Sequence, residues 1–176
     1  MEPPTGVPER TVSAVIVDGP LTAPAESAAV SPVHAAQLSG AIGATLRFEG
    51  IVRREEADAD CAGAVRELAA LEYQTYDPMA QHELEHLARR VAARHGLRSL
   101  AVLHSRGSVP VGQVSFVLIV TAAHRAEAIA GLTEFIDRMK QDVPIWKHPV
   151  WKSAPEAAPP HCHGDPTSES SAPRAP

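Results

Sequence analysis

The stretch Lys140-Gln141-Asp142-Val143-Pro144-Ile145-Trp146-Lys147 places two lysines on either side of a proline at which a helix must end. Proline lacks the amide donor and disfavours a helical conformation at the residue before it, here Val143. We therefore expect Lys140 in the last turn of a helix and Lys147 on the extended segment that follows. Both ammonium groups can then converge on one anion, with Trp146 as an apolar anchor that fixes Lys147. A basic last turn that stabilises the helix dipole is the alternative explanation for Lys140 alone.

The helix that ends in this stretch is expected from His124 to about Asp142. Its apolar stripe is predicted at helical spacing by Ile129, Leu132, Ile136 and Met139. Lys140 follows Ile136 by one turn and lies at the edge of that stripe. We therefore expect Lys140 to be partly withdrawn from water, where burial and nearby cations disfavour the charged form and make the neutral amine accessible.

Upstream patterns predict the remaining elements. Five strands are expected, at Thr11 to Val17, Gly43 to Arg53, Val65 to Tyr76, Leu97 to His104 and Gln113 to Ala122. The last of these is apolar on both faces and is therefore expected at the centre of the sheet. A helix should begin at Asp77-Pro78, with Asp77 as N-cap and Pro78 in the first position, and stop at Gly96. A short helix near Pro32 to Leu38 and a mobile loop from Arg54 to Gly63 complete the prediction.

Length and composition predict a single domain over residues 11–152, between a disordered N-terminus (1–10) and a disordered Pro/Ala/Ser-rich tail (153–176). Met1 to Arg10 carries no apolar run, so we expect no signal peptide, no membrane span and a cytoplasmic protein. Cys61 and Cys162 fit neither a disulfide framework nor a zinc site. The run His161-Cys162-His163 is read as incidental, and we expect neither a metal nor a bound cofactor.

The formal net charge of −5 argues against a nucleic-acid-binding protein, because such affinity depends on a basic surface. The basic residues are nevertheless clustered at the ends of predicted elements, in Arg53-Arg54, His124-Arg125 and the Lys140/Lys147 pair. A cationic pocket inside an acidic protein is expected to take a small anionic substrate.

Several motifs occur in the order and spacing of one known family: Phe48-Glu49-Gly50-Ile51-Val52-Arg53, Leu71-Glu72-Tyr73, Met79-Ala80, His104 with Gly107, Val111-Gly112, His124-Arg125 and Lys140 through Lys147. From about Val12 to about Trp151 the chain resembles the MoaE family, the large catalytic subunits of molybdopterin synthase. The resemblance implies an α+β fold, a mixed, largely antiparallel sheet with flanking helices (MoaE-like alpha/beta hammerhead).

The resemblance also implies an activity and partners. Proteins of this family are sulfurtransferases that convert cyclic pyranopterin monophosphate into the dithiolene of molybdopterin. The sulfur arrives as a thiocarboxylate on the C-terminal Gly-Gly of a small ubiquitin-like subunit of the MoaD family. The family forms a central homodimer within a heterotetramer, and each pocket takes basic residues from both halves of the dimer.

Matched position by position, Lys140 and Lys147 correspond to the family's two catalytic lysines. Lys140 is expected to carry proton transfer or transient covalent chemistry, and Lys147 to bind the thiocarboxylate or substrate oxyanions. Arg53 suits a phosphate or a carboxylate terminus, although a solvated charge at a strand end is the alternative. His124 and Arg125 are expected on the substrate phosphate.

Phe48 is read first as a core residue, although the family pattern places it beside the pocket as a substrate-binding residue. His104 is read as a structural histidine. The chain also departs from the family pattern: the arginine after His104 is displaced by one position to Arg106, and His148-Pro149 replaces a basic residue and a glutamate. The segment from Arg54 to Gly63 is unusually acidic, and the terminal segment is shortened.

These departures leave a second hypothesis, a non-catalytic MoaE-like subunit that binds anions or assists assembly. A third hypothesis is an unrelated regulatory α+β module. The retention of both lysines at this spacing favours the enzyme.

Overall fold

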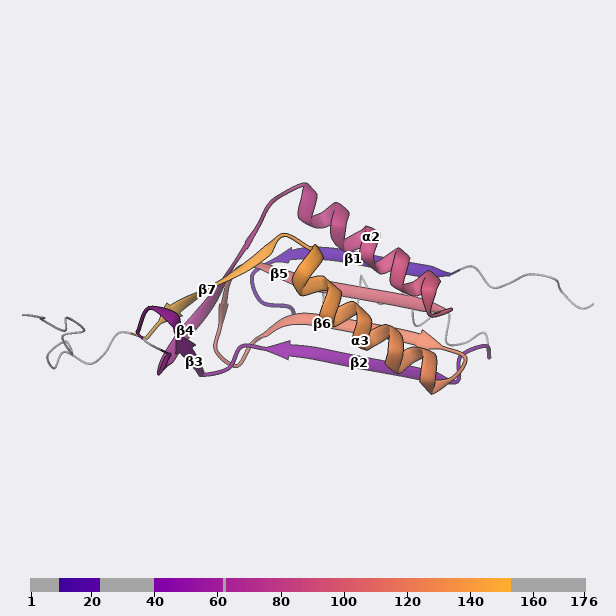
Figure 1. Ribbon diagram of the computed structural model, residues 1–176, viewed down its shortest axis with the longest axis horizontal. Coiled ribbons are helices and arrows are strands. Elements are labelled where there is room, and N and C mark those ends of the chain that lie inside the picture. Colours follow the sequence, from indigo (N-terminus) through magenta and orange to yellow (C-terminus); the bar gives the residue numbers. More distant parts are fainter. Residues whose placement is uncertain (1–9, 23–39, 62, 153–176) are drawn as a thin grey trace, which may run out of the picture.

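Seven strands and two helices succeed one another in residues 10–22, 40–61 and 63–152, which are the residues described by the computed structural model (Figure 1). Their bounds are β1 Thr11–Asp18, β2 Ala44–Ile51, β3 Glu55–Asp58, a 3-10 turn at Ala59–Cys61, β4 Ala64–Thr75, α2 Met79–Arg94, β5 Ser99–Pro110, β6 Val114–Ala122, α3 Arg125–Asp142 and β7 Ile145–Trp151. The five predicted strands and two of the three predicted helices are confirmed. The expected helix near Pro32 to Leu38 lies outside the described residues, as do residues 1–9 and 153–176 of the two terminal segments.

All seven strands form one sheet in the order β2-β6-β5-β4-β3, with β1 beside β5 and β7 beside β4. The β1–β5 pair is parallel and the other pairs are antiparallel, which confirms the mixed, largely antiparallel α+β fold. The first half of β5 pairs with β1 and β6, and its second half pairs with β4. Gly107 marks this change with φ +80°, a conformation that glycine adopts without steric cost.

The sheet therefore has two parts, which Figure 1 separates clearly. The wide part contains β1, β5, β6 and β2, and both helices cover one of its faces. The narrow part contains β3, β4 and β7 and projects beyond the helices. Because β5 belongs to both parts, the sheet changes direction at the place where the last turn of α3 meets β7.

The main core lies between the helices and the wide part of the sheet. Residues 115–122 of β6 are buried throughout, which confirms that this strand is central. Leu84, Leu87 and Val91 of α2 and Phe135 of α3 reach zero to one per cent exposure against it. Complete burial of one such side chain stabilises the fold by about 1.5–3 kcal/mol.

The predicted apolar stripe of α3 is partly wrong. Ile129 is 52% exposed, whereas the fully buried positions are Ala128 and Phe135. Gly131 of α3 lies against Leu97, between α2 and β5, and a Cβ added there would lie 3.0 Å from Cδ1 of Leu97. The buried face of α3 therefore runs along Ala128, Gly131 and Phe135, and Leu132, Ile136 and Met139 beside it are half-buried.

Two local predictions are also corrected. The segment from Arg54 to Gly63 contains β3, which pairs with β4 in the register Glu56↔Arg66 and Asp58↔Ala64, so it is not a structureless loop. Asp77 does not cap α2: Pro78 occupies the N-cap position, and no side chain caps it. The carboxylate of Asp77 instead accepts hydrogen bonds from Thr75 Oγ1 at 3.0 Å and from Arg106.

Within residues 10–22, 40–61 and 63–152, neither helix is both long and apolar enough to cross a bilayer.

Candidate active site

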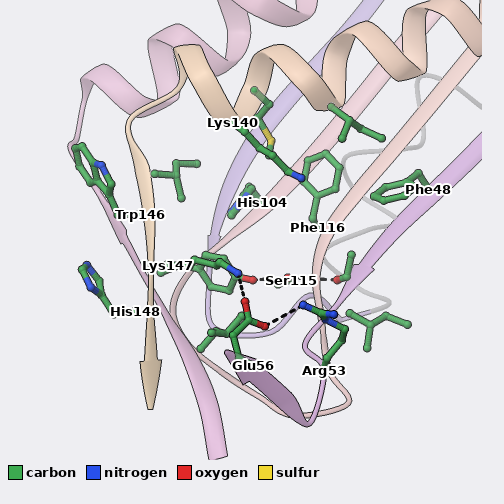
Figure 2. A pocket seen from close by; sticks show the side chains of 17 residues that line it. Phe48, Arg53, Glu56, His104, Ser115, Phe116, Lys140, Trp146, Lys147 and His148 are labelled. Atoms are coloured by element: carbon green, nitrogen blue, oxygen red, sulfur yellow. Dashed lines mark hydrogen bonds and ion pairs between the residues drawn. The ribbon is translucent and has the colours of Figure 1, made fainter. Parts of the chain in front are cut away.

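A cavity of about 660 Å³ lies where α3 ends and the two parts of the sheet meet (Figure 2). Its lining comes from β2, the short segment after it, β3, β4, β5, β6, the last turns of α3, and β7. Apolar side chains supply much of the wall, among them Ile51, Leu71, Ile136, Met139 and Ile145. The cavity has the size and the mixed lining of a small-molecule site.

Three cations from three different segments line this cavity. Arg53 follows β2, Lys140 lies in the last turn of α3, and Lys147 lies on β7. The helix stop at Pro144 thus separates the two lysines in sequence and brings both to one cavity, as the sequence predicts. Three converging cations provide a binding site for an anion.

The environment of Lys140 differs from the expectation. Its side chain is exposed, while the preceding Ile136 and Met139 are half-buried and carry the packing. The reason is its position in the final turn of α3, which reaches past the sheet core to the mouth of the cavity. The prediction that a single chain partly withdraws Lys140 from water is therefore wrong.

Glu56 is a feature of the site that the sequence does not reveal. Its Oε1 accepts a hydrogen bond from Lys147 Nζ, and its Oε2 accepts one from Arg53 Nη2 at 3.1 Å (Figure 2). The hydrogen bond from Lys147 keeps the pKa of Glu56 below its usual value. The sequence does show the acidic pair Glu55-Glu56 directly after Arg53-Arg54. It predicts a contact with the site only once β3 is known to be a strand.

Aromatic side chains form another wall of the cavity. Phe48 and Phe116 meet edge to face with ring centroids 6.0 Å apart. Phe48 is 38% exposed and lines the cavity, so its reading as a core residue is wrong, and its contact with a substrate stays a prediction. The Tyr73 hydroxyl donates to Ser115 Oγ at 2.9 Å, and Ser115 donates to the Gly50 carbonyl at 3.2 Å. This chain of hydrogen bonds fixes the Tyr73 ring against β6.

His104 combines a structural role with a place in the cavity wall. The residue is buried, and its Nδ1 lies 2.8 Å from the Ser105 carbonyl oxygen, so this nitrogen is the donor. Its ring lies 5.2 Å from Tyr73 and 5.7 Å from Phe116, centroid to centroid. Burial lowers the pKa of His104, so its imidazole is neutral at pH 7. The reading of a satisfied histidine is confirmed, and its contact with the cavity is additional.

His124 and Arg125 are placed far from this cavity. They lie at the start of α3, whereas Lys140 lies in its last turn, and a helix of 18 residues is about 27 Å long. Neither belongs to the described residues that line the cavity. Both side chains are exposed, so they remain available to a second molecule. One chain by itself therefore does not bring the predicted phosphate-binding pair to the two lysines.

The departures from the family pattern have clear positions. Arg106 lies outside the cavity and bridges two carboxylates, with Nε 2.7 Å from Asp18 Oδ1 and a second bond to Asp77. His148 lines the cavity, and Pro149 lies on β7 opposite Leu71 of β4. Arg106 is thus a link between β1 and the segment before α2 and does not contribute to the cavity.

The sequence profile described as MoaE protein matches residues 23–142 of the chain. The match includes Phe48, Arg53 and Lys140 of the cavity and the His124-Arg125 pair. The chain belongs to the MoaE family. Its last matched residue, Asp142, directly precedes the segment that carries Lys147.

Individual MoaE-family relatives agree with this assignment. The molybdopterin synthase catalytic subunit of Oryza sativa subsp. indica is 38% identical over 111 residues, which cover 63% of this chain and 54% of the relative. The subunit of the same name from Homo sapiens is 30% identical over 130 residues, covering 74% and 65%. The chain thus spans about half the length of the rice relative and just under two thirds of the human one.

A solved structure confirms the fold. A chain from the "Protein-protein complex of subunit 1 and 2 of Molybdopterin-converting factor" of Helicobacter pylori 26695 matches with a TM-score of 0.59. The match covers 78% of this chain and 88% of that one, at 23% sequence identity. The α+β arrangement that holds the cavity is therefore shared with a protein of a molybdopterin-converting complex.

Proposed function

We propose that this MoaE-family chain is the catalytic subunit of a molybdopterin synthase. It transfers sulfur from a thiocarboxylated small subunit to cyclic pyranopterin monophosphate and so makes the dithiolene of molybdopterin. The observation that carries this proposal is the cavity in which Lys140, Lys147 and Arg53 meet. Two relatives with 30–38% identity bear the name molybdopterin synthase catalytic subunit, which supports the same activity.

The cavity offers a suitable surface for each part of the substrate. A pterin is a flat, polar ring system, and the exposed face of Phe48 with the Phe116 and Tyr73 rings provides aromatic surface against which it can pack. Arg53 and Lys147 provide charge for oxyanions. Ile136 and Met139 add apolar surface beside these charges.

The roles of the two lysines follow from their positions. Lys140 lies in the last turn of α3 and, within the described residues, makes no ion pair. Its amine is therefore available for proton transfer or for transient covalent attack on the acyl carbon of the thiocarboxylate. Lys147 already binds a carboxylate of the chain itself, which makes it the better residue to hold a carboxylate-like end. The thiocarboxylate sulfur forms a bond to a side-chain carbon of the pterin as an oxygen substituent leaves that carbon, which gives a thioester between the two molecules. Water then attacks the acyl carbon and breaks the acyl C–S bond, so the sulfur stays on the pterin as a thiolate and the small subunit is released with a C-terminal carboxylate.

Two chains are required to complete this site. His124 and Arg125 bind the substrate phosphate in the proposal, yet they lie at the opposite end of α3 from Lys140. We therefore propose a homodimer in which these two residues reach the cavity of the partner subunit. The small subunit is a ubiquitin-like protein of the MoaD family that inserts its C-terminal Gly-Gly, giving a heterotetramer; the Helicobacter complex of subunits 1 and 2 supports such a pairing.

A reconstitution experiment tests this function. The purified chain is mixed with a thiocarboxylated small subunit and cyclic pyranopterin monophosphate, and molybdopterin formation is measured. Turnover supports the catalytic subunit. Binding of the small subunit without turnover would instead support the non-catalytic, assembly-type subunit.

A further inference from the structure

We propose that Glu56 is a displaceable occupant of the carboxylate subsite, which an incoming chain end must expel before it binds. The inference rests on the proposed function, because it concerns the place where the tail of the small subunit would end. It adds an autoinhibitory residue of the chain itself. Glu56 lies in the segment from Arg54 to Gly63, whose acidity is a departure from the family pattern.

The geometry of Glu56 is that of a bound carboxylate ligand. One oxygen accepts from Lys147 and the other from Arg53, at 3.1 Å, so the group is divided between two cations (Figure 2). A C-terminal carboxylate or thiocarboxylate presents the same pair of acceptor atoms with the same charge. A second carboxylate placed between the same two cations would meet the negative charge of Glu56 and the space that its side chain fills, so such an end can bind both cations only after Glu56 has moved.

The main competing explanation is that the ion pairs of Glu56 stabilise the fold. The following contacts argue against this explanation. The side chains of Lys147 and Arg53 are 56% and 75% exposed, and ion pairs of that kind contribute little to stability. β3 is fixed by its ladder with β4 and by the buried Asp58, whose carboxylate accepts from Arg66. Arg66 in turn lies over the Trp151 ring, 4.6 Å from its centroid.

Glu56 is also well placed to leave. It lies on β3, a strand of four residues that, among the strands of the described residues, pairs with β4 alone at the edge of the sheet. A rotation of its side chain frees both cations without breaking a backbone hydrogen bond of the β3–β4 ladder. The subsite formed by Lys147 and Arg53 can therefore change from an ion-paired to an open state by one side-chain movement.

Glu55 provides a matched control. It is adjacent, exposed and carries the same charge, but it is not among the described residues that line the cavity. The substitutions Glu56→Gln and Glu55→Gln change the net charge equally. Only the first removes the carboxylate from Lys147 and Arg53.

The test measures calorimetric binding of a ten-residue peptide ending in Gly-Gly with a free carboxylate, and of the same peptide with a C-terminal amide. Glu56→Gln should tighten binding of the free-acid peptide by about three- to twentyfold. Glu55→Gln should leave the affinity for the free-acid peptide within about twofold of the parent, and the amidated peptide should bind no more tightly to either variant.

In a Lys147→Ala background the effect of Glu56→Gln should shrink, because one of the two competing contacts is gone. Glu56→Ala is a second variant without the amide of glutamine, and thermal unfolding verifies that each variant is folded.

Three results would overturn the proposal: no gain with either Glu56 variant, an equal gain with Glu55→Gln, or an equal gain with the amidated peptide. Inorganic phosphate is titrated in parallel, and a gain for phosphate without a gain for the free-acid peptide would also contradict a carboxylate subsite. If Glu56→Gln has no effect while Lys147→Ala still weakens binding, the autoinhibition is wrong and the proposed function stands. If neither substitution matters, the site assignment of the proposed function fails as well.

Discussion

Arg90, in the C-terminal part of α2, donates to Oδ2 of Asp142 at 2.9 Å and so ties the end of one helix to the last turn of the other. Arg138, one turn earlier on α3, donates to the same oxygen, also at 2.9 Å. Asp142 directly precedes Val143-Pro144, where the chain leaves α3 and starts toward Lys147. This ion-pair cluster therefore holds the junction that brings the two lysines to one cavity.

The Arg138 and Arg90 hydrogen bonds keep the pKa of Asp142 below its usual value, so the cluster should make stability depend on pH. A group with a lowered folded-state pKa contributes stability that is present above its unfolded pKa, about 3.9, and is lost as pH falls through the folded value. Asp142→Asn should therefore lower the free energy of unfolding at pH 7, and the difference from the parent chain should decrease below about pH 4. Urea denaturation at pH 7 and at pH 3 measures the free energy of unfolding of both proteins.

Asp137→Asn is the matched control, because Asp137 is an exposed aspartate on the same helix. It should have a much smaller effect at pH 7. A destabilisation by Asp142→Asn that stayed constant down to pH 3 would show that packing, and not the charge of the carboxylate, is responsible.

The sequence predicts the elements of this fold well where the pattern is local. Gln113 to Ala122 is apolar on both faces, and β6 is indeed the buried central strand. Pro144 ends α3, and Gly96, with φ +61°, ends α2. Each signal depends on backbone chemistry or on a strong periodicity, and neither requires knowledge of a distant segment.

Predictions fail where a distant partner decides the structure. β3 is polar and forms because β4 offers it a free edge and Arg66 neutralises Asp58. Asp77 looks like a helix cap, but Arg106, which is 29 residues away, binds its carboxylate. The sequence likewise identifies the cations of the cavity from motifs but not Glu56, because that contact with Lys147 spans 91 residues.

Lys140→Ala should reduce the rate of molybdopterin formation by at least about 10²-fold, the usual cost of losing an acid–base group. The fold should be retained, since the Lys140 side chain is exposed. Steady-state turnover with the thiocarboxylated small subunit measures the effect. Lys152→Ala is the control, because Lys152 pairs with Glu67 at 3.2 Å and is not among the described cavity residues. Near-normal turnover of a folded Lys140→Ala protein would refute the catalytic assignment.

Removal of the terminal Gly-Gly from the small subunit should weaken its association with this chain and abolish turnover. In the proposed mechanism the tail reaches Lys147 inside the cavity, so the body of the small subunit alone would make only part of the contact. Calorimetric titration of the full-length and truncated small subunits measures the difference. Equal affinities would exclude a mechanism in which the tail enters the cavity.

Arg125→Ala should act on the substrate and leave the small subunit unaffected. Charge-assisted hydrogen bonds to phosphate are worth about 1.5–3 kcal/mol each, so binding of the pterin precursor should weaken by about ten- to a hundredfold. Affinity for the small subunit should barely change, because in the proposed dimer Arg125 binds the substrate phosphate, whereas Lys147 and Arg53 hold the tail. Arg47→Ala is a suitable control, since Arg47 is an exposed strand arginine that binds Glu49 at 2.7 Å.

The same substitution tests whether each site is shared between two chains. In a mixed dimer of one Arg125→Ala chain and one Lys140→Ala chain, one cavity receives an intact Arg125 from one chain and an intact Lys140 from the other, while the second cavity lacks both. Equal mixing of subunits gives half mixed dimers, so activity should recover to about a quarter of the parent level from two nearly inactive proteins. Differently tagged chains, purified together, verify that mixed dimers have formed. If these verified mixed dimers remained as inactive as either parent variant, each site would have to be built from one chain. Arg125 would then have no role in the site, because the 18-residue α3 separates it from Lys140 of the same chain.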